Sequence, residues 1–147
     1  MEPRVQTRAQ TIVLGDDGIF RARSVPGTEI HLADAVEIIR ALTVLGGGET
    51  RPILVDLSGV RAISGEARAY FAGPETAKVE SAAGLMVSSP LTRVIGNFFM
   101  GLNKPRIPAR LFQHETEALA WLRERVAAES SEAVTRLQRA IESQPGS

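Results

Sequence analysis

Apolar and polar positions follow two different spacings along the chain, and each spacing predicts one type of element. Runs of apolar or β-branched residues bounded by Gly, Pro, Asp or Ser predict strands at 11–14, 19–25, 51–57, 84–88 and 109–113. Apolar residues that recur every three or four positions predict helices at 32–45, 64–73, 75–81, 89–102 and 115–128. A hairpin is therefore followed by helices and strands in alternation, which favours a mainly parallel sheet with right-handed crossovers.

Turn and cap residues set the expected ends of these elements. Three glycines at 46–48 end the first helix, and they precede a strand without a following Gly-Lys-Ser/Thr, so they do not form a phosphate-binding loop. Pro74 is expected to interrupt the second helix, because proline lacks the backbone N–H that the helix needs. Ser89 followed by Pro90 predicts an N-cap and a first helical position.

The predicted organisation is one α/β domain at 11–128 between a flexible N-terminus at 1–10 and a helical extension with a loose C-terminus at 129–147. In the extension, apolar residues recur at helical spacing, at Val134, Leu137 and Ile141. Ser130 and Ser131 interrupt the run and are expected to cap a separate helix from Glu132. Such a short helix needs a surface, which the domain, a second copy in a homodimer or a different protein could supply.

Composition narrows the function classes. The chain has 147 residues, 17 basic and 17 acidic, and a neutral chain is not expected to bind nucleic acid or anionic membrane by charge alone. It has no cysteine, so no disulfide, thiolate metal site or cysteine nucleophile is expected. No apolar run approaches the roughly 20 residues of a membrane span. These features predict a cytoplasmic protein that is not an integral membrane protein and uses no cofactor.

The stretch "ILVDLSGVRAIS" at 53–64 resembles the STAS domain, the fold of anti-sigma-factor antagonists. The run from Ser89 to Leu122 resembles a bacterial offshoot described as STAS/Sec14-like, and the similarity covers about residues 11–126. The resemblance implies a STAS-like α/β fold and a bacterial signalling role through protein–protein interaction. In the STAS family, a serine at the start of the helix after this strand is the phosphoacceptor.

The phosphoacceptor does not carry over to this chain. Residues 56–60 match the family's Asp-Leu-Ser-Gly-Val, but Ser64 falls where the family has Asp, and Gly65 falls where it has the acceptor serine. Ser64 is therefore expected to be a helix N-cap, with a regulated or catalytic hydroxyl as the alternative. Glu66 follows in the first helical turn, where a carboxylate suits the helix dipole or could present a fixed negative charge near the lost phosphate.

One long segment lacks acidic residues: from Ser81 to His114 there is no Asp or Glu, while Arg93, Lys104 and two further arginines are present. Two interpretations of this segment are open. It is either a solvated basic face, or a site for an acidic partner or small anion, formed by strand ends and the N-terminus of a helix. The candidate interaction or anion-binding residues are Ser58, Ser64, Glu66, Arg68, Ser88, Ser89, Arg93, Asn97 and Lys104.

The expected function is a non-catalytic regulatory or protein-interaction module that binds a protein partner or itself. A small-molecule or lipid-binding domain is the first alternative, although Leu91, Val94, Phe98 and Phe99 are at core spacing and are expected in the core. A hydrolytic enzyme is the second alternative. It is less favoured because His31 and His114 lie far apart, without a Gly-x-Ser-x-Gly turn or metal-ligand spacing.

Overall fold

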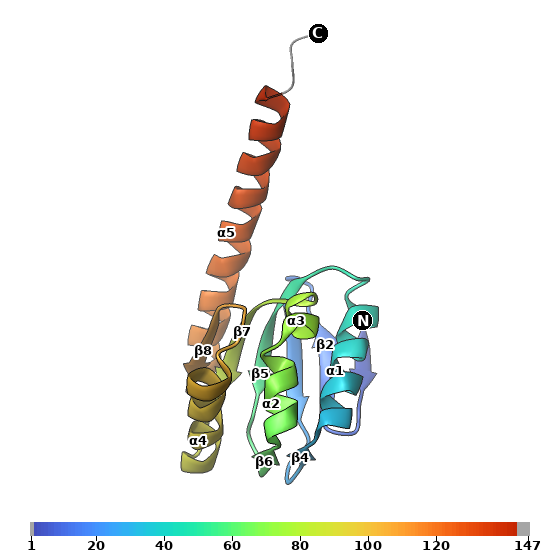
Figure 1. Cartoon of the computed structure of the whole chain (residues 1–147), viewed down its shortest axis with the longest axis vertical. Helices are drawn as coiled ribbons and strands as arrows, with labels where there is room; N and C mark the ends of the chain where they lie inside the picture. The colour runs from blue at the N-terminus through green and yellow to red at the C-terminus, as the bar shows by residue number, and fades with distance from the viewer. Residues whose placement is uncertain (1, 144–147) are drawn as a thin grey trace.

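Six strands pair into one mixed sheet in the computed structural model, which describes residues 2–143 (Figure 1). In spatial order they are β1 (Arg4–Gln6), β2 (Gln10–Leu14), β3 (Phe20–Ser24), β5 (Arg51–Asp56), β7 (Glu80–Met86) and β8 (Ala109–Phe112). The first three pair antiparallel, whereas β3, β5, β7 and β8 pair in parallel. A second, two-stranded parallel sheet joins β4 (Glu29–Ile30) to β6 (Ala62–Ile63). The predicted fold class, an α/β fold with a hairpin and then alternating elements, is confirmed.

Helices cover both faces of the sheet. Four helices precede β8, namely α1 (Leu32–Leu45), α2 (Gly65–Phe71), α3 (Pro74–Ala77) and α4 (Pro90–Phe98), and a π-helical turn η1 (Phe99–Asn103) continues α4. The last helix, α5 (Glu115–Glu142), packs on the other face, against β5 and β7 (Figure 1). Adjacent residues of β5 enter different clusters, since Ile53 packs with α1 and Leu54 packs with Ala118 and Leu122 of α5. The helical break at Pro74 is confirmed.

Three expected boundaries are wrong. The N-terminus was expected to be flexible over 1–10, but Arg4–Gln6 forms β1 and pairs with β2. The strand expected at 84–88 begins at Glu80, so the short helix before it ends at Ala77. The serines at 130–131 do not interrupt α5, because exposed serines in an otherwise strong helical sequence weaken a helix without ending it. No helix end therefore marks the expected domain boundary at 128.

An ion pair ties the N-terminal segment to the start of α1. The Arg8 guanidinium donates through Nε and Nη2 to the two carboxylate oxygens of Asp34, at 2.6 and 2.7 Å. The buried Asp34 carboxylate also accepts from the His31 backbone N–H at 2.9 Å, which caps the helix. The Arg8 hydrogen bond lowers the pKa of Asp34, so this carboxylate stays ionised around neutral pH.

We expect Asp34→Ala to lower the free energy of unfolding by about 1–3 kcal/mol, because it removes a helix cap and the carboxylate that pairs with Arg8. Asp34→Asn is the matched control, since its amide oxygen still accepts from the His31 N–H. Urea denaturation of the three proteins measures the effect. If Asp34→Ala unfolded at the same urea concentration as the wild type, Asp34 would not contribute to the stability of the fold.

Candidate interaction surface

The Asp56–Val60 turn, which carried the family resemblance, has a structural role at each position. The Asp56 carboxylate accepts from the Ser58 backbone N–H at 2.9 Å, and the side chains of Leu57 and Val60 are buried. Gly59 has a φ of +80°, and a Cβ there would lie 2.9 Å from Cα of Pro26. The motif therefore fixes a tight turn against the segment that enters β4.

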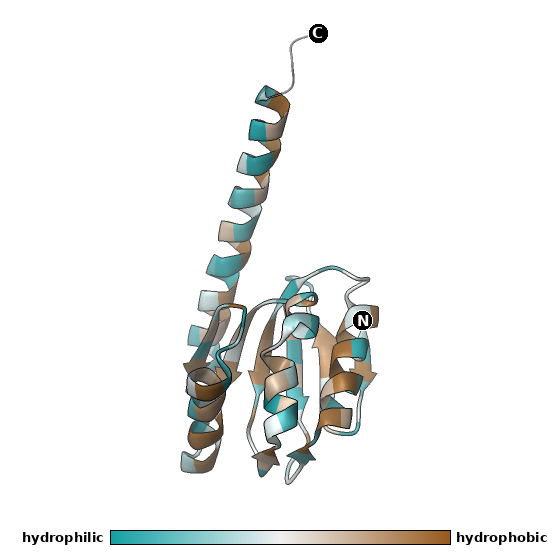
Figure 2. Ribbon diagram, viewed as in Figure 1, coloured by the Kyte–Doolittle hydropathy of each residue, from teal (hydrophilic) through white to brown (hydrophobic). Residues whose placement is uncertain are grey.

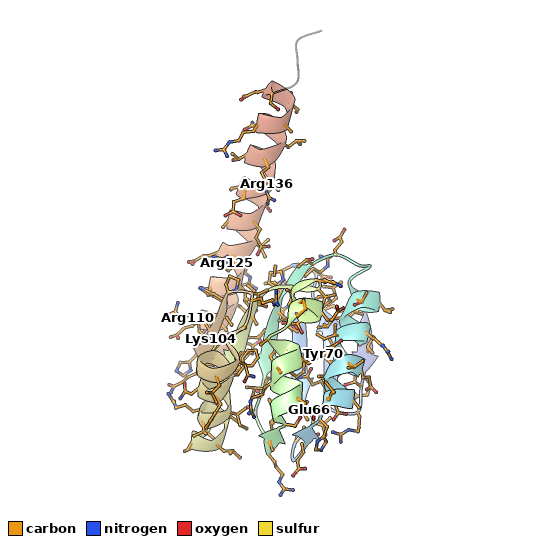
Figure 3. The ribbon with its side chains drawn as sticks, viewed as in Figure 1. Glu66, Tyr70, Lys104, Arg110, Arg125 and Arg136 are labelled. Carbon is orange, nitrogen blue, oxygen red and sulfur yellow. The ribbon has the colours of Figure 1, made fainter. Side chains whose placement is uncertain are left out.

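Ser64 caps α2, as predicted. Its Oγ accepts from the Ala67 backbone N–H at 3.1 Å, and its own N–H donates to the Ile30 carbonyl at 2.9 Å. Gly65, at the position of the family's phosphoacceptor, begins α2, and Glu66 lies exposed in its first turn. Figure 3 shows Glu66 near the lower end of α2.

The other three candidate serines lie at neighbouring strand ends and also hydrogen-bond within the protein. The hydroxyls of Ser58 and Ser88, which follow β5 and β7, are 3.0 Å apart. Ser89 caps α4, since its Oγ accepts from the Thr92 backbone N–H at 3.2 Å. The fold thus brings Ser58 and Ser88 together, and within residues 2–143 no hydrogen bond joins Ser64 to this pair.

Arg68 links α2 to the α4–η1 segment. Its guanidinium donates to the Ile63 carbonyl at 2.7 Å and to Oδ1 of Asn103 at 3.2 Å, and it lies 5.9 Å from the centre of the Phe98 ring. Phe98 and Asn103 were not among the candidate site residues. Arg68 is 30 or more positions away from both residues in the sequence, so only the tertiary fold reveals these contacts.

The side of α4 that carries its smallest residues faces the sheet. Thr92 and Gly96 are buried, and a Cβ on Gly96 would lie 2.9 Å from Cδ2 of Leu111. Ile95 and Phe99 complete the inner side, since both pack against the core while partly exposed. Glycine allows the helix to lie close to the sheet, so a narrow strip of side chains is enough to hold it.

The large apolar side chains on the outer side of α4–η1 are exposed, which corrects the expectation that they lie in the core. Leu91, Val94 and Phe98 are 49–50% exposed, and Leu102 is 66% exposed. Figure 2 shows hydrophobic residues on α4. Leu91, Val94, Phe98 and Leu102 are called the outer stripe below. Of the four residues expected in the core, only Phe99 packs against it.

Polar and basic side chains border the outer stripe. Arg93, Asn97 and Lys104 are all exposed. Lys104 ends η1 in a left-handed conformation, with φ of 50°, and Figure 3 shows it at the end of the segment away from Glu66. Arg106 and Arg110 follow and are also exposed. The acid-free segment thus carries an apolar stripe with a basic border.

An apolar cavity of about 60 Å³ lies under α2 and α4–η1, above β5 and β7. Its lining is apolar except for Gln10 and Glu80. The cavity is much smaller than the roughly 300–1,000 Å³ of ordinary ligand pockets. It therefore gives little room for the lipid that the first alternative function requires.

Glu80 is buried in this lining because of a β-bulge that the sequence analysis missed. From Arg51 to Ile53 the strand β5 advances two residues, while β7 advances three, from Glu80 to Ala83. The extra residue lets Glu80 and Ala83 both face the cavity. Glu80 is 7% exposed, and burial raises the pKa of its carboxyl from 4.5 to about 8.

The fold does not bring the two histidines together. His31 and His114 lie exposed at the starts of α1 and α5. Over residues 2–143 there is no group of three or more His, Cys, Asp or Glu side chains that could hold a metal ion. No helix in the same range has both the length and the apolar character of a membrane span.

Comparison with known proteins identifies the class of fold. An anti-sigma factor antagonist from Mycobacterium paratuberculosis is similar over 84% of this chain and 93% of its own, with 19% identity and a TM-score of 0.52. An uncharacterised protein of the DUF3478 family from Shewanella loihica PV-4, described as having a SpoIIAA-like fold, covers 83% and 92% with 17% identity and a TM-score of 0.46. The expected STAS-like fold, the fold of anti-sigma-factor antagonists, is confirmed.

A family assignment follows from the sequence. The family described as "Domain of unknown function (DUF7793)" matches residues 13–126, and the chain belongs to it. A protein of unknown function from Arthrobacter sp. FB24 is 39% identical over 76% of this chain and 96% of its own, with a TM-score of 0.31. No curated protein matches the chain.

We expect Ser64→Ala to lower the free energy of unfolding by about 0.5–2 kcal/mol, whereas Ser64→Asp should stay near the wild-type value because Asp caps a helix as well as Ser does. Thermal and urea unfolding of both variants tests the cap. Stoichiometric phosphate on Ser64, found by mass spectrometry in protein from its native organism, would contradict a purely structural role.

We expect the wild-type protein to lose stability as pH rises from about 4.5 to about 8, because the folded state holds a proton on Glu80 that the unfolded state releases. The stabilisation is complete below pH 4.5 and amounts to about 1.4 kcal/mol per unit of pKa difference. In Glu80→Gln this loss should disappear. Urea denaturation of both proteins between pH 4.5 and 9 measures this loss, and the difference between their two pH profiles reports Glu80. Parallel pH profiles would show that Glu80 ionises normally.

Proposed function

We propose that the protein is a non-catalytic regulatory module of STAS type that binds a partner protein in the cytoplasm through the outer stripe of α4–η1. One observation carries the proposal: Leu91, Val94, Phe98 and Leu102 are 49–66% exposed on one side of a helix whose other side is already packed. A contiguous exposed apolar patch with a polar border is typical of a protein-binding site.

The charges around the stripe indicate the chemistry of the partner. Arg93 and Lys104 lie beside it, and no acidic residue occurs between Ser81 and His114. A matching surface has an apolar groove for the four side chains and carboxylates at its border, because opposite charges across an interface favour encounter and fix its orientation. Arg68 supports the stripe from α2 through its contacts with Phe98 and Asn103. Asn97 is exposed on α4 next to Phe98, and Glu66 is exposed on α2, the helix that carries Arg68.

The energy available from the stripe suits a reversible complex. Burying the exposed halves of four large apolar side chains would contribute on the order of 3–6 kcal/mol, before the cost of association is subtracted. Ser58, Ser64, Ser88 and Ser89 are already engaged in hydrogen bonds within the protein, so we assign them to the scaffold of the surface. The absence of a phosphoacceptor at Gly65 favours regulation by partner binding alone.

We expect Val94→Glu with Leu102→Glu to abolish capture of the partner by the full-length protein, because two charges would enter the apolar contact. Val44→Glu is the matched control, since Val44 is 79% exposed on α1, away from the stripe. Affinity capture from the native organism, with cross-linking and mass spectrometry, identifies a protein that the control retains and the stripe variant loses. Equal capture by both variants would contradict the proposed surface.

The same capture tests the basic border. Arg93→Glu with Lys104→Glu should abolish binding of an acidic partner without unfolding the domain, because substitutions at exposed positions usually change stability by about 0.5 kcal/mol or less. Arg4→Glu with Arg40→Glu makes the same charge change at exposed positions elsewhere and should bind normally. Normal binding by the border variant would assign Arg93 and Lys104 to a merely solvated face.

A further inference from the structure

The second half of α5 leaves the domain. Every residue from Ser130 to Ser143 is exposed, and Figure 1 shows this part of the helix projecting away from the sheet. An isolated helix of about 14 residues is marginal in water, even with good helix formers. A surface that covers the projecting part would therefore stabilise it.

The projecting part carries a coiled-coil spacing. Three, four, three and four residues separate the successive members of one series, which consists of Ala127, Ser130, Val134, Leu137 and Ile141. This spacing is that of the a and d positions of a heptad repeat, with Val134 and Ile141 at a and Leu137 at d. The series is called the tail seam below. Its three large members are 55–63% exposed, and Figure 2 shows hydrophobic residues along one edge of this part of α5.

The positions that flank the tail seam are small or uncharged. The e and g positions, which lie beside the seam, are Ser131, Ala133, Gln138 and Ala140. The charged residues fall at the outer positions, at Glu129, Glu132, Arg136, Arg139 and Glu142. Small flanks allow another helix to approach closely. Uncharged flanks also lack the e and g charges that direct a coiled coil to a different partner sequence.

The tail seam lies to one side of the face with which the first half of α5 covers the sheet. Leu122 is fully buried against that sheet. At about 100° per residue, Val134, Leu137 and Ile141 lie roughly 120°, 60° and 100° around the helix from Leu122. Because α5 is one continuous helix from Glu115 to Glu142, it cannot bend back to bring the seam onto its own domain.

We propose that the tail seam binds the tail seam of a second copy of this chain, as a short parallel two-stranded coiled coil. β-branched residues at a and leucine at d favour two parallel strands, which is the arrangement of Val134, Leu137 and Ile141. In a two-fold dimer each seam residue meets its own counterpart, so one sequence supplies both halves of the interface. This pairing is independent of the outer stripe, which lies on α4–η1.

The size of the seam sets the expected strength. Residues 127–141 span about 22 Å of helix, and a contact of this length buries less than the roughly 1,200–2,000 Å² of a stable interface. The dimer is therefore weak and reversible. It forms as the protein concentration rises, and it would be reinforced wherever the partner of the outer stripe holds two copies together.

Sedimentation of the full chain from about 10 µM to about 1 mM tests the pairing, because a weak dimer populates across this range. The weight-average mass should rise towards twice the monomer mass. Leu137→Glu should remain monomeric, whereas Thr135→Glu, which adds the same charge at an exposed outer position, should dimerise like the wild type. Circular dichroism checks that both variants keep their helix. A monomeric wild type at 1 mM, or a dimer that Leu137→Glu leaves intact, would overturn the proposal.

Disulfide trapping tests the orientation, and the chain has no cysteine of its own. In a parallel dimer Ser130→Cys brings two thiols together at a d position, so mild oxidation should link the chains. Glu132→Cys, at an outer position, should link far less. In an antiparallel dimer centred on the seam, residue 130 would lie roughly 12 Å along the axis from its counterpart. If the Ser130→Cys variant dimerises but oxidation does not link its two chains, parallel pairing is ruled out. Neither outcome alters partner capture through Val94 and Leu102, which tests the other surface separately.

Discussion

Burial of both faces of β5 and β7 is the constraint on which the rest of the structure depends. Parallel strands are covered on both sides, and here α1, α2 and α4 cover one face while α5 alone covers the other. On the first of these faces, Gly96 lets α4 lie close to Leu111. On both helices the side that faces the sheet is packed, and the apolar side chains of the outer stripe and of the tail seam lie outside these contacts.

The sequence predicts those parts of the fold that depend on neighbouring residues. The hairpin, the break at Pro74 and the caps at Ser64 and Ser89 are set by turn and cap chemistry within a few positions. The alternation of strands and helices then determines the parallel sheet. The candidate site is predicted only in outline, because the basic border of α4–η1 is visible in the sequence while the contact of Arg68 with Phe98 is not.

Features that depend on distant contacts are missed. Glutamate has a low intrinsic propensity for strands, so the sequence around Glu80 does not predict one. That β7 begins at Glu80 is seen only in its pairing with Arg51 and in the bulge that follows. The large apolar residues of α4 share one broad face, and periodicity alone does not decide whether the part with Ile95 or the part with Val94 faces the sheet. That choice is made by Gly96, whose missing side chain matters only once Leu111 lies opposite.

The Asp56–Val60 turn has a consequence for how such sequences are interpreted. Gly59 is required by its positive φ and by the closeness of Pro26, and Asp56 is required by its bond to the Ser58 N–H, whether or not a phosphate is ever added nearby. The five-residue motif is thus a signature of backbone geometry and is uncoupled from the chemistry of the helix that follows. A match to the motif therefore reports the geometry of this turn, while the chemistry at the start of α2 has to be judged from Gly65 and the residues that follow it.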